Sequence, residues 1–427
     1  LYLTREVARD RSRSRLLFLN TSALRVMLAI AGIPLLVGFL MARQGIADPP
    51  LTVEVILAIL ILYVGLLPNS LSTGFTALFY AHERAELPAA VATAATLNKV
   101  ILGLFALLLG TGFVGLAVVS IVTNILTMAI LAVNGRKLIP RVEAVETRIQ
   151  PKLMRTMMGE SAPLLFNHFL ATIFFQIDVI IIEAIHGATM VGQYSVAYKW
   201  LTALNVIPSF FTQALLPVMA RQAREDRAGL RQNYILAIKL LFSMALPIAI
   251  FFTFTAYFWA GVLGGSAYLP DGAIATQLII WSIPIGWMNS LTQYALIALD
   301  LQRRLTRAFL AGVVFNIGAN LLFVPQYGYQ AAAVTTILSE GILFIGFAWL
   351  LRQGFQQLDP SERSIPWRAL LWRPLVSATL MVVVMWVGFP THALGAMVAG
   401  GVVYVGTLVA LGTWDLREVA QLRRIRG

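Results

Sequence analysis

The feature that most constrains this chain is a series of long apolar runs that extends from one end to the other. Each run has about 20 residues, the length of helix that crosses roughly 30 Å of hydrocarbon. A hydrophobic content of 59% and a mean hydropathy of +0.79 leave too little polar surface for a water-soluble domain. The sequence therefore predicts an all-α membrane protein. We expect about twelve transmembrane helices, at residues 20–42, 51–80, 87–109, 112–134, 160–185, 190–219, 230–256, 272–299, 306–325, 328–351, 368–388 and 392–413.

The basic residues are sorted between the two sides of this predicted bundle. Of the 32 Lys and Arg residues, 27 lie in segments expected on one side, and only Arg43 lies on the other. By the positive-inside rule, the basic side and both ends of the chain are expected in the cytoplasm. The net charge of +12 is not gathered into one patch with aromatic partners, so we expect no nucleic acid partner.

An internal repeat indicates how the helices are organised. The stretch "NSLSTGFTALFYAHER" at 69–84 aligns without gaps with "NSLTQYALIALDLQRR" at 289–304, an offset of 220 residues. A second match supports the repeat: Arg25 precedes Pro34 in the first predicted helix, as Lys239 precedes Pro247 in the seventh. A repeat unit of six helices predicts two pseudo-symmetric parallel lobes around a central cavity. Because the helices at 160–185 and 190–219 have no partners in the first repeat, we expect two further helices before Leu1, and fourteen in the intact protein.

This repeat predicts the domain organisation. Residues 1–134 form an N-terminal lobe, and 159–352 form a C-terminal lobe. The intervening segment 135–158 mixes charged residues with spaced apolar ones, which is typical of an amphipathic helix on the inner leaflet, with a solvated linker as the alternative. Residues 353–427 form a final helix pair and a basic cytoplasmic tail.

Cations inside the predicted helices are candidates for substrate binding, because a charge within the bilayer is costly and faces a bundle interior. Lys99 lies about 18 Å along its helix, too deep for easy snorkelling. Arg25 and Lys239 lie shallower, and each is either a second cavity cation or a side chain that reaches the interface. A cavity rich in cations suits an anionic substrate such as phosphate or pyrophosphate.

Three further charges are candidates for coupling or gating. Asp178 and Lys199 lie on either side of the short turn "IHGATM", and we expect them to meet across a helical hairpin. Their alternative role is a buried ion pair that only fixes the hairpin. Glu340 is near mid-membrane after a turn at Gly328, where a carboxylate binds and releases a proton or clamps two helices together.

Neutral polar side chains accompany prolines in two of the predicted helices. Asn69 and Ser72 follow Pro68. Asn289 and Gln293 follow Pro284 in the matching helix. Prolines kink helices, so these polar belts are expected to line the central cavity, although such groups also pack between helices. No metal site is expected, because the chain has no Cys and its four His are scattered.

The stretch from 174 to 221, "FFQIDVIIIEAIHGATMVGQYSVAYKWLTALNVIPSFFTQALLPVMAR", resembles the polysaccharide transporter family of lipid-linked oligosaccharide flippases. The family has an Asp before a branched aliphatic run, a "vGxYsxAyk" stretch and a later Pro. The matching residues here are Asp178, Gly192, Tyr194, Ser195, Ala197, Tyr198, Lys199 and Pro217. The segments "TREVARDRSRSR" and "GYQAAAVTTILSE" also resemble the family. It lies within the superfamily of multidrug and toxin extrusion pumps and lipid II flippases.

The resemblance implies a two-lobed helical transporter in a bacterial or archaeal cytoplasmic (inner) membrane. Its implied activity is the flipping of an undecaprenyl-diphosphate-linked oligosaccharide (an O-antigen, capsule or exopolysaccharide unit) from the inner to the outer leaflet by alternating access. Membrane lipids, a polysaccharide polymerase and assembly proteins are the expected partners, and no cofactor is expected. An ion-coupled multidrug or small-molecule exporter is the alternative. An enzyme is not expected, because the longest predicted outer loop, 257–271, offers only Asp271 as a charge.

Overall fold

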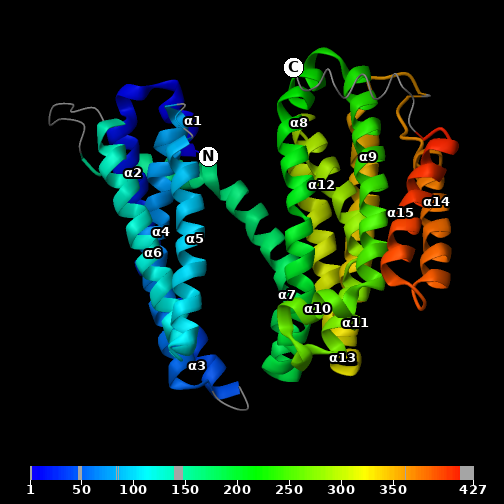
Figure 1. The fold of residues 1–427 in the computed structure, drawn as a ribbon. Coiled ribbons are helices and arrows are strands. Elements are labelled where there is room, and N and C mark those ends of the chain that lie inside the picture. Colours follow the sequence, from blue (N-terminus) through cyan, green and yellow to red (C-terminus); the bar gives the residue numbers. More distant parts are fainter. Residues whose placement is uncertain are drawn as a thin grey trace. The chain divides into compact units, whose positions relative to one another are not determined.

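The computed structural model describes residues 2–46, 51–82, 84, 86–138, 148–360 and 362–413, and all regular structure in these residues is helical (Figure 1). The chain forms two compact units, Leu1–Phe166 and Asn167–Gly427, called unit 1 and unit 2 below. The division lies inside the helix α7 (Pro151–Leu204). Each unit is described by itself.

Unit 1 is a set of packed helices. Its elements are α1 (Tyr2–Arg9), α2 (Ser14–Ala31), α3 (Ile33–Ile46), α4 (Val53–Ala81), α5 (Glu86–Leu108) and α6 (Gly112–Gly135), followed by the first part of α7. Thr52 caps α4 by accepting a hydrogen bond from the backbone N–H of Val55. The turn between α5 and α6 contains Gly110 and Gly112 at φ 71° and 56°, values that favour glycine.

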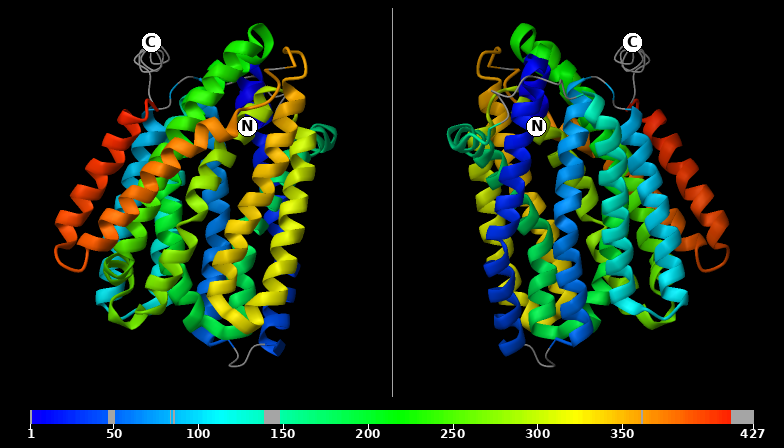
Figure 2. Two further views of the ribbon diagram at one scale, coloured as in Figure 1. Left: turned by 90° about the vertical axis from the view of Figure 1, so that its right-hand side faces the viewer. Right: turned by 90° about the vertical axis from the view of Figure 1, so that its left-hand side faces the viewer.

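Unit 2 is built from helical segments of 9 to 53 residues. They are α8 (Val206–Glu225), α9 (Arg227–Phe254), α10 (Ala256–Gly264), α11 (Asp271–Ile279), α12 (Ser282–Ala298), α13 (Gln302–Gly354), α14 (Trp367–Gly388) and α15 (Ala393–Ala410), together with the end of α7. The last two helices pack as an antiparallel hairpin, drawn in orange and red in Figure 2. The Tyr404 hydroxyl on α15 donates a hydrogen bond of 2.7 Å to the Ser243 carbonyl on α9.

Two of the long helices are helical pairs with a turn at a glycine. α7 turns at Gly187, with φ 80° and ψ −179°, and α13 turns at Gly328, with φ 55° and ψ −137°. The turns expected in "IHGATM" and at Gly328 are therefore confirmed. A side chain at 328 would be strained by its positive φ, and its Cβ would also lie 2.7 Å from the Met190 sulfur.

Nine helical segments among the described residues are long and apolar enough to cross a membrane. Two of the differences from the expected twelve come from α7 and α13, each of which holds two expected spans, one on either side of its glycine turn, and is counted once. The expected span at 272–299 is divided into α11 and α12, each shorter than a membrane-crossing helix. The linker expected at 135–158 is only partly described: α7 begins at Pro151, and 139–147 lie outside the described residues.

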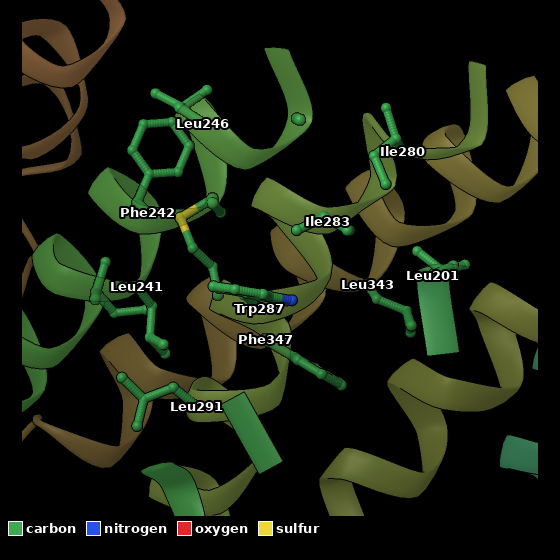
Figure 3. Packing of buried hydrophobic residues seen from close by; sticks show 14 of the residues in the cluster. Leu201, Leu241, Phe242, Leu246, Ile280, Ile283, Trp287, Leu291, Leu343 and Phe347 are labelled. Atoms are coloured by element: carbon green, nitrogen blue, oxygen red, sulfur yellow. The ribbon is translucent and has the colours of Figure 1, made fainter. Parts of the chain in front are cut away.

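The core of unit 2 surrounds α12. This helix packs against α8, α9 and α13, and its Trp287 is fully buried. Figure 3 shows Trp287 among Phe242 of α9, Ile283 of α12 and Phe347 of α13. The helix pairs matched by the repeat also pack alike, since α2 contacts α4 in unit 1 and α9 contacts α12 in unit 2.

Candidate functional site

A polar cavity lies inside unit 2, between the arms of α7 and the helices α8, α12 and α13. Its volume is about 450 Å³. Its hydrogen-bonding side chains are Gln176, Tyr198, Thr202, Asn205, Ser209, Asn289, Ser290, Gln293, Tyr294 and Glu340. Amides and hydroxyls at this density inside an apolar bundle form a site that binds neutral hydrogen-bonding groups.

Asn289 and Glu340 join two walls of this cavity. The Asn289 side-chain nitrogen donates 2.6 Å to Glu340 Oε2 and 2.8 Å to the Glu340 backbone oxygen. Gly286 lies beside the carboxylate, and a Cβ there would be 3.4 Å from Oε1. Glu340 is 6% exposed, so its carboxylate relies on the Asn289 amide. The pair holds α12 against the second arm of α13 at the cavity surface.

The opposite wall comes from α7 and α8. The Tyr198 hydroxyl donates a 2.5 Å hydrogen bond to the Phe175 carbonyl across the two arms of α7. Asn205 lies at the junction of α7 and α8, where its side-chain oxygen accepts 3.1 Å from the Trp287 ring nitrogen. Both residues are therefore fixed by neighbouring helices, which gives the cavity a defined shape.

Asp178 is placed differently from the sequence expectation. It is fully buried, and its carboxylate accepts 2.6 Å from the Tyr194 hydroxyl and 2.8 Å from the Val179 backbone N–H. Lys199 is exposed, and in the described parts of the chain no ion pair joins it to Asp178. The expected meeting of Asp178 and Lys199 is thus wrong. A lysine five residues after Tyr194 points to another side of the helix, so tyrosine supplies the partner.

Removing the Tyr194 hydroxyl is expected to destabilise unit 2. In Tyr194→Phe the Asp178 carboxylate keeps one backbone donor but loses a buried side-chain donor, at a cost of about 1–3 kcal/mol. Thermal unfolding of the purified protein in detergent measures this loss. The matched control is Tyr257→Phe, where the side chain is 52% exposed. Equal melting temperatures for the two variants would contradict the role of the Tyr194 hydrogen bond.

The candidate residues of unit 1 occupy two kinds of environment. Arg25 on α2 is half-buried, and its guanidinium donates to the Ser70 carbonyl on α4 beside Gly74. Ser72 is buried, and its hydroxyl donates a hydrogen bond of 2.8 Å to the Pro68 carbonyl within the same helix, α4. Lys99 and Asn69 are exposed on the surface of unit 1. Arg25 therefore joins two helices, while Lys99 is free of such a contact in the described residues.

Lys239 is the remaining cation that the sequence singled out. It is 9% exposed on α9 and is not among the residues that line the unit 2 cavity. Glu340 is the one carboxylate among the residues that line this cavity, and no Lys or Arg is among them. The structure thus brings together Asn289, Gln293 and Glu340 of the predicted set, while Lys239 and Asp178 are not among the lining residues.

Several cavity residues were not predicted from the sequence. Gln176 and Asn205 line the cavity, and Tyr198 was noted only for its family resemblance. A usable signal was present, because polar residues in a membrane helix usually face the bundle interior. No cluster of three or more His, Asp or Glu able to hold a metal occurs in the described residues.

The helices and the cavity define a multi-pass membrane protein with a polar site inside a helical bundle. Residues 1–223, just over half of the chain, match the family described as "Polysaccharide biosynthesis protein". The chain belongs to this family, which confirms the family resemblance. Residues 163–322 also match the MatE family.

Curated relatives of this chain are distant. The "Probable flippase AglR" of Haloferax volcanii is 24% identical over 265 residues, covering 58% of this chain and 52% of that protein. The "Uncharacterized membrane protein MJ1068" of Methanocaldococcus jannaschii is 23% identical over 221 residues, covering 51% and 43%. The chain thus spans about half the length of the curated relatives it matches.

Solved structures share the fold. The lipid II flippase MurJ in an inward closed conformation has a TM-score of 0.63 at 13% identity, covering 96% of this chain and 90% of that chain. The MATE transporter VcmN of Vibrio cholerae has a TM-score of 0.60 at 15% identity, covering 84% and 83%. These matches are to transporters and flippases rather than to enzymes.

Proposed function

We propose that this protein is a flippase that moves a lipid-linked oligosaccharide from the inner to the outer leaflet of a cytoplasmic membrane by alternating access. The observation that carries the proposal is the unit 2 cavity, whose lining is mostly amides, hydroxyls and aromatic rings. Such groups bind sugar hydroxyls without requiring a charge. Membership of the polysaccharide biosynthesis family supports a glycan as the transported group.

The diphosphate of such a substrate requires cations. In unit 1, Lys99 is exposed, and it is the deep cation for which the described residues provide no partner. We assign Lys99 the role of contacting the diphosphate. Arg25, which donates to the Ser70 carbonyl, positions α2 on α4 and takes a secondary role. The polyprenyl chain would remain in lipid, where its burial has no cost.

The test is translocation of a fluorescent lipid-diphosphate-linked oligosaccharide in proteoliposomes that contain the full-length protein. The fluorophore is quenched from outside, so the protected fraction reports flipping. We expect Lys99→Ala to slow the initial rate about tenfold or more, because a charge-assisted phosphate contact contributes about 1.5–3 kcal/mol. Lys152→Ala, an exposed lysine in the first turn of α7, is the matched control and should retain the full rate.

Absence of flipping for lipid-linked sugars of several compositions would overturn the proposal. Equal rates for Lys99→Ala and Lys152→Ala would instead overturn only the role of Lys99. A folding control by size-exclusion chromatography accompanies each variant.

A second candidate function is an ion-coupled exporter of small cationic molecules. It is favoured by the MatE match over 163–322 and by Glu340, the one carboxylate among the residues that line the unit 2 cavity. Uptake of a fluorescent cationic dye into the same proteoliposomes under a proton gradient tests this function. Dye transport without lipid flipping would select the exporter.

A further inference from the structure

A second pocket lies at the end of α13, where the helix begins and where its second arm ends. It has a volume of about 690 Å³. Its walls come from Arg304 and Arg307 on the first arm, and from Trp349 and Gln353 on the second arm. Glu340, which marks the polar cavity described above, is not among its lining residues. The second arm therefore presents one face to the polar cavity and another face to this pocket.

Close packing of the two arms closes the inner end of the pocket. Gly346 lies on the second arm opposite Ala308 on the first, and a Cβ at 346 would lie 3.3 Å from the Ala308 Cβ. Small residues allow helix backbones to approach within a membrane. Gly346 and Ala308 both line the pocket, together with the two arginines.

The charge of this pocket is positive. Arg304 and Arg307 are three residues apart and lie on one helix face, and no carboxylate is among the residues that line the pocket. Arg304 donates 2.6 Å to the Gln353 side-chain oxygen, which fixes its guanidinium at the pocket wall. For Arg307, no hydrogen bond or ion pair is found within the described part of the chain. Two guanidinium groups facing one space form a site for phosphate oxygens.

Other arginines at this end of unit 2 have structural roles. Arg227 donates 2.8 Å to the Gly354 carbonyl, and Arg231 donates 3.0 Å to the Ser364 carbonyl. These bonds fix the segment that follows α13. Arg307 is different, because it borders an open pocket and has no such carbonyl partner among the described residues.

The ligand of this pocket must be amphipathic. Trp349 is 61% exposed, and Leu350 adds an apolar wall beside it. Tryptophan is enriched where a bilayer meets water, and basic pockets between helices bind anionic headgroups. We propose that the pocket formed by Arg304, Arg307, Trp349 and Gln353 binds the phosphate-bearing headgroup of an anionic membrane lipid. This site is separate from the transport cavity, and its leaflet is the cytoplasmic one if the basic side of the bundle faces the cytoplasm.

Binding of short-chain lipids to the purified full-length protein in neutral detergent tests this site. The probes are dioctanoyl phosphatidylglycerol, dioctanoyl phosphatidylcholine and inorganic phosphate, and the readouts are native mass spectrometry and a titration of the thermal unfolding midpoint. We expect the protein to bind phosphatidylglycerol in preference to both other probes. The double variant Arg304→Gln with Arg307→Gln should bind phosphatidylglycerol at least about tenfold more weakly.

The matched control is Arg303→Gln. It removes one positive charge from the same turn, half of what the double variant removes, and Arg303 does not line the pocket. Unchanged lipid affinity in this control, with a loss in the double variant, supports the site. If Arg303→Gln lost as much lipid affinity as the double variant, net charge alone would explain the loss, and the proposal would be overturned. Inorganic phosphate that binds as tightly as the lipid, or equal binding of phosphatidylcholine, would also overturn it. If the double variant does not fold, Trp349→Phe tests the site instead, because it retains both arginines. We expect Trp349→Phe to bind phosphatidylglycerol more weakly than the original protein. Its control, Trp386→Phe, should bind phosphatidylglycerol with unchanged affinity.

Discussion

Replacement of Trp287 by alanine is expected to destabilise unit 2 by about 3–5 kcal/mol, the range for truncating a large buried aromatic side chain. Trp287 is fully buried, and its ring nitrogen donates to the Asn205 side-chain oxygen at 3.1 Å. Its loss leaves a cavity between α9, α12 and α13, and it also leaves Asn205 without that donor. In a bilayer the hydrophobic effect is weak between helices, so the loss of packing contacts dominates.

Reversible unfolding of the purified protein in mixed micelles measures this prediction. Trp386→Ala is the matched control, because Trp386 is 74% exposed on α14 and its truncation should change the free energy of unfolding by less than about 0.5 kcal/mol. Trp287→Phe retains most of the ring volume but not the donor, so its loss should lie between the two. A Trp287→Ala protein as stable as the Trp386→Ala protein would contradict the core described around α12.

Neutralising Glu340 is expected to reduce transport without unfolding the protein. In Glu340→Gln the side-chain oxygen still accepts from Asn289, so the link between α12 and α13 is retained. The substitution removes the ionisable group that we propose binds and releases a proton during the cycle. If the carboxylate stabilises one state of the cycle by about 1.5–3 kcal/mol, the initial rate should fall roughly 10- to 100-fold.

The rate is measured in proteoliposomes with and without an imposed proton gradient. Glu54→Gln is the matched control, since Glu54 is an exposed carboxylate in the first turn of α4 and should leave the rate unchanged. Asn289→Leu provides the reciprocal variant, because it leaves the Glu340 carboxylate without its amide donor and should reduce both stability and rate. A Glu340→Gln protein that transports at the original rate and with the original gradient dependence would show that the carboxylate has no coupling role.

The class of protein and its turns were predictable because they depend on local sequence. Long apolar runs predicted a multi-pass helical bundle, and the glycines at 187 and 328 predicted two turns, since each has a positive φ that other residues adopt at a cost. Span boundaries were less predictable. The break between α11 and α12 lies within an apolar segment, where hydropathy alone does not distinguish one helix from two.

The candidate site was predictable only in part. Polar residues in apolar helices pointed to Asn289, Gln293 and Glu340, and the structure brings these three to one cavity. The predicted partner of Asp178 was wrong. Opposite charge suggested Lys199, whereas in the α7 hairpin the Tyr194 hydroxyl donates to the Asp178 carboxylate.

By itself, the sequence determined the class of multi-pass helical membrane protein, the positions of two helical turns and the family of this protein. Each of these depends on composition, on helical period or on a contiguous motif. The tertiary structure decided which polar groups meet: Glu340 with Asn289 from 51 residues away, Asp178 with Tyr194, and Arg304 with Gln353. These pairings depend on the rotation of each helix and on the reach of its side chains, which only the packing of the helices fixes.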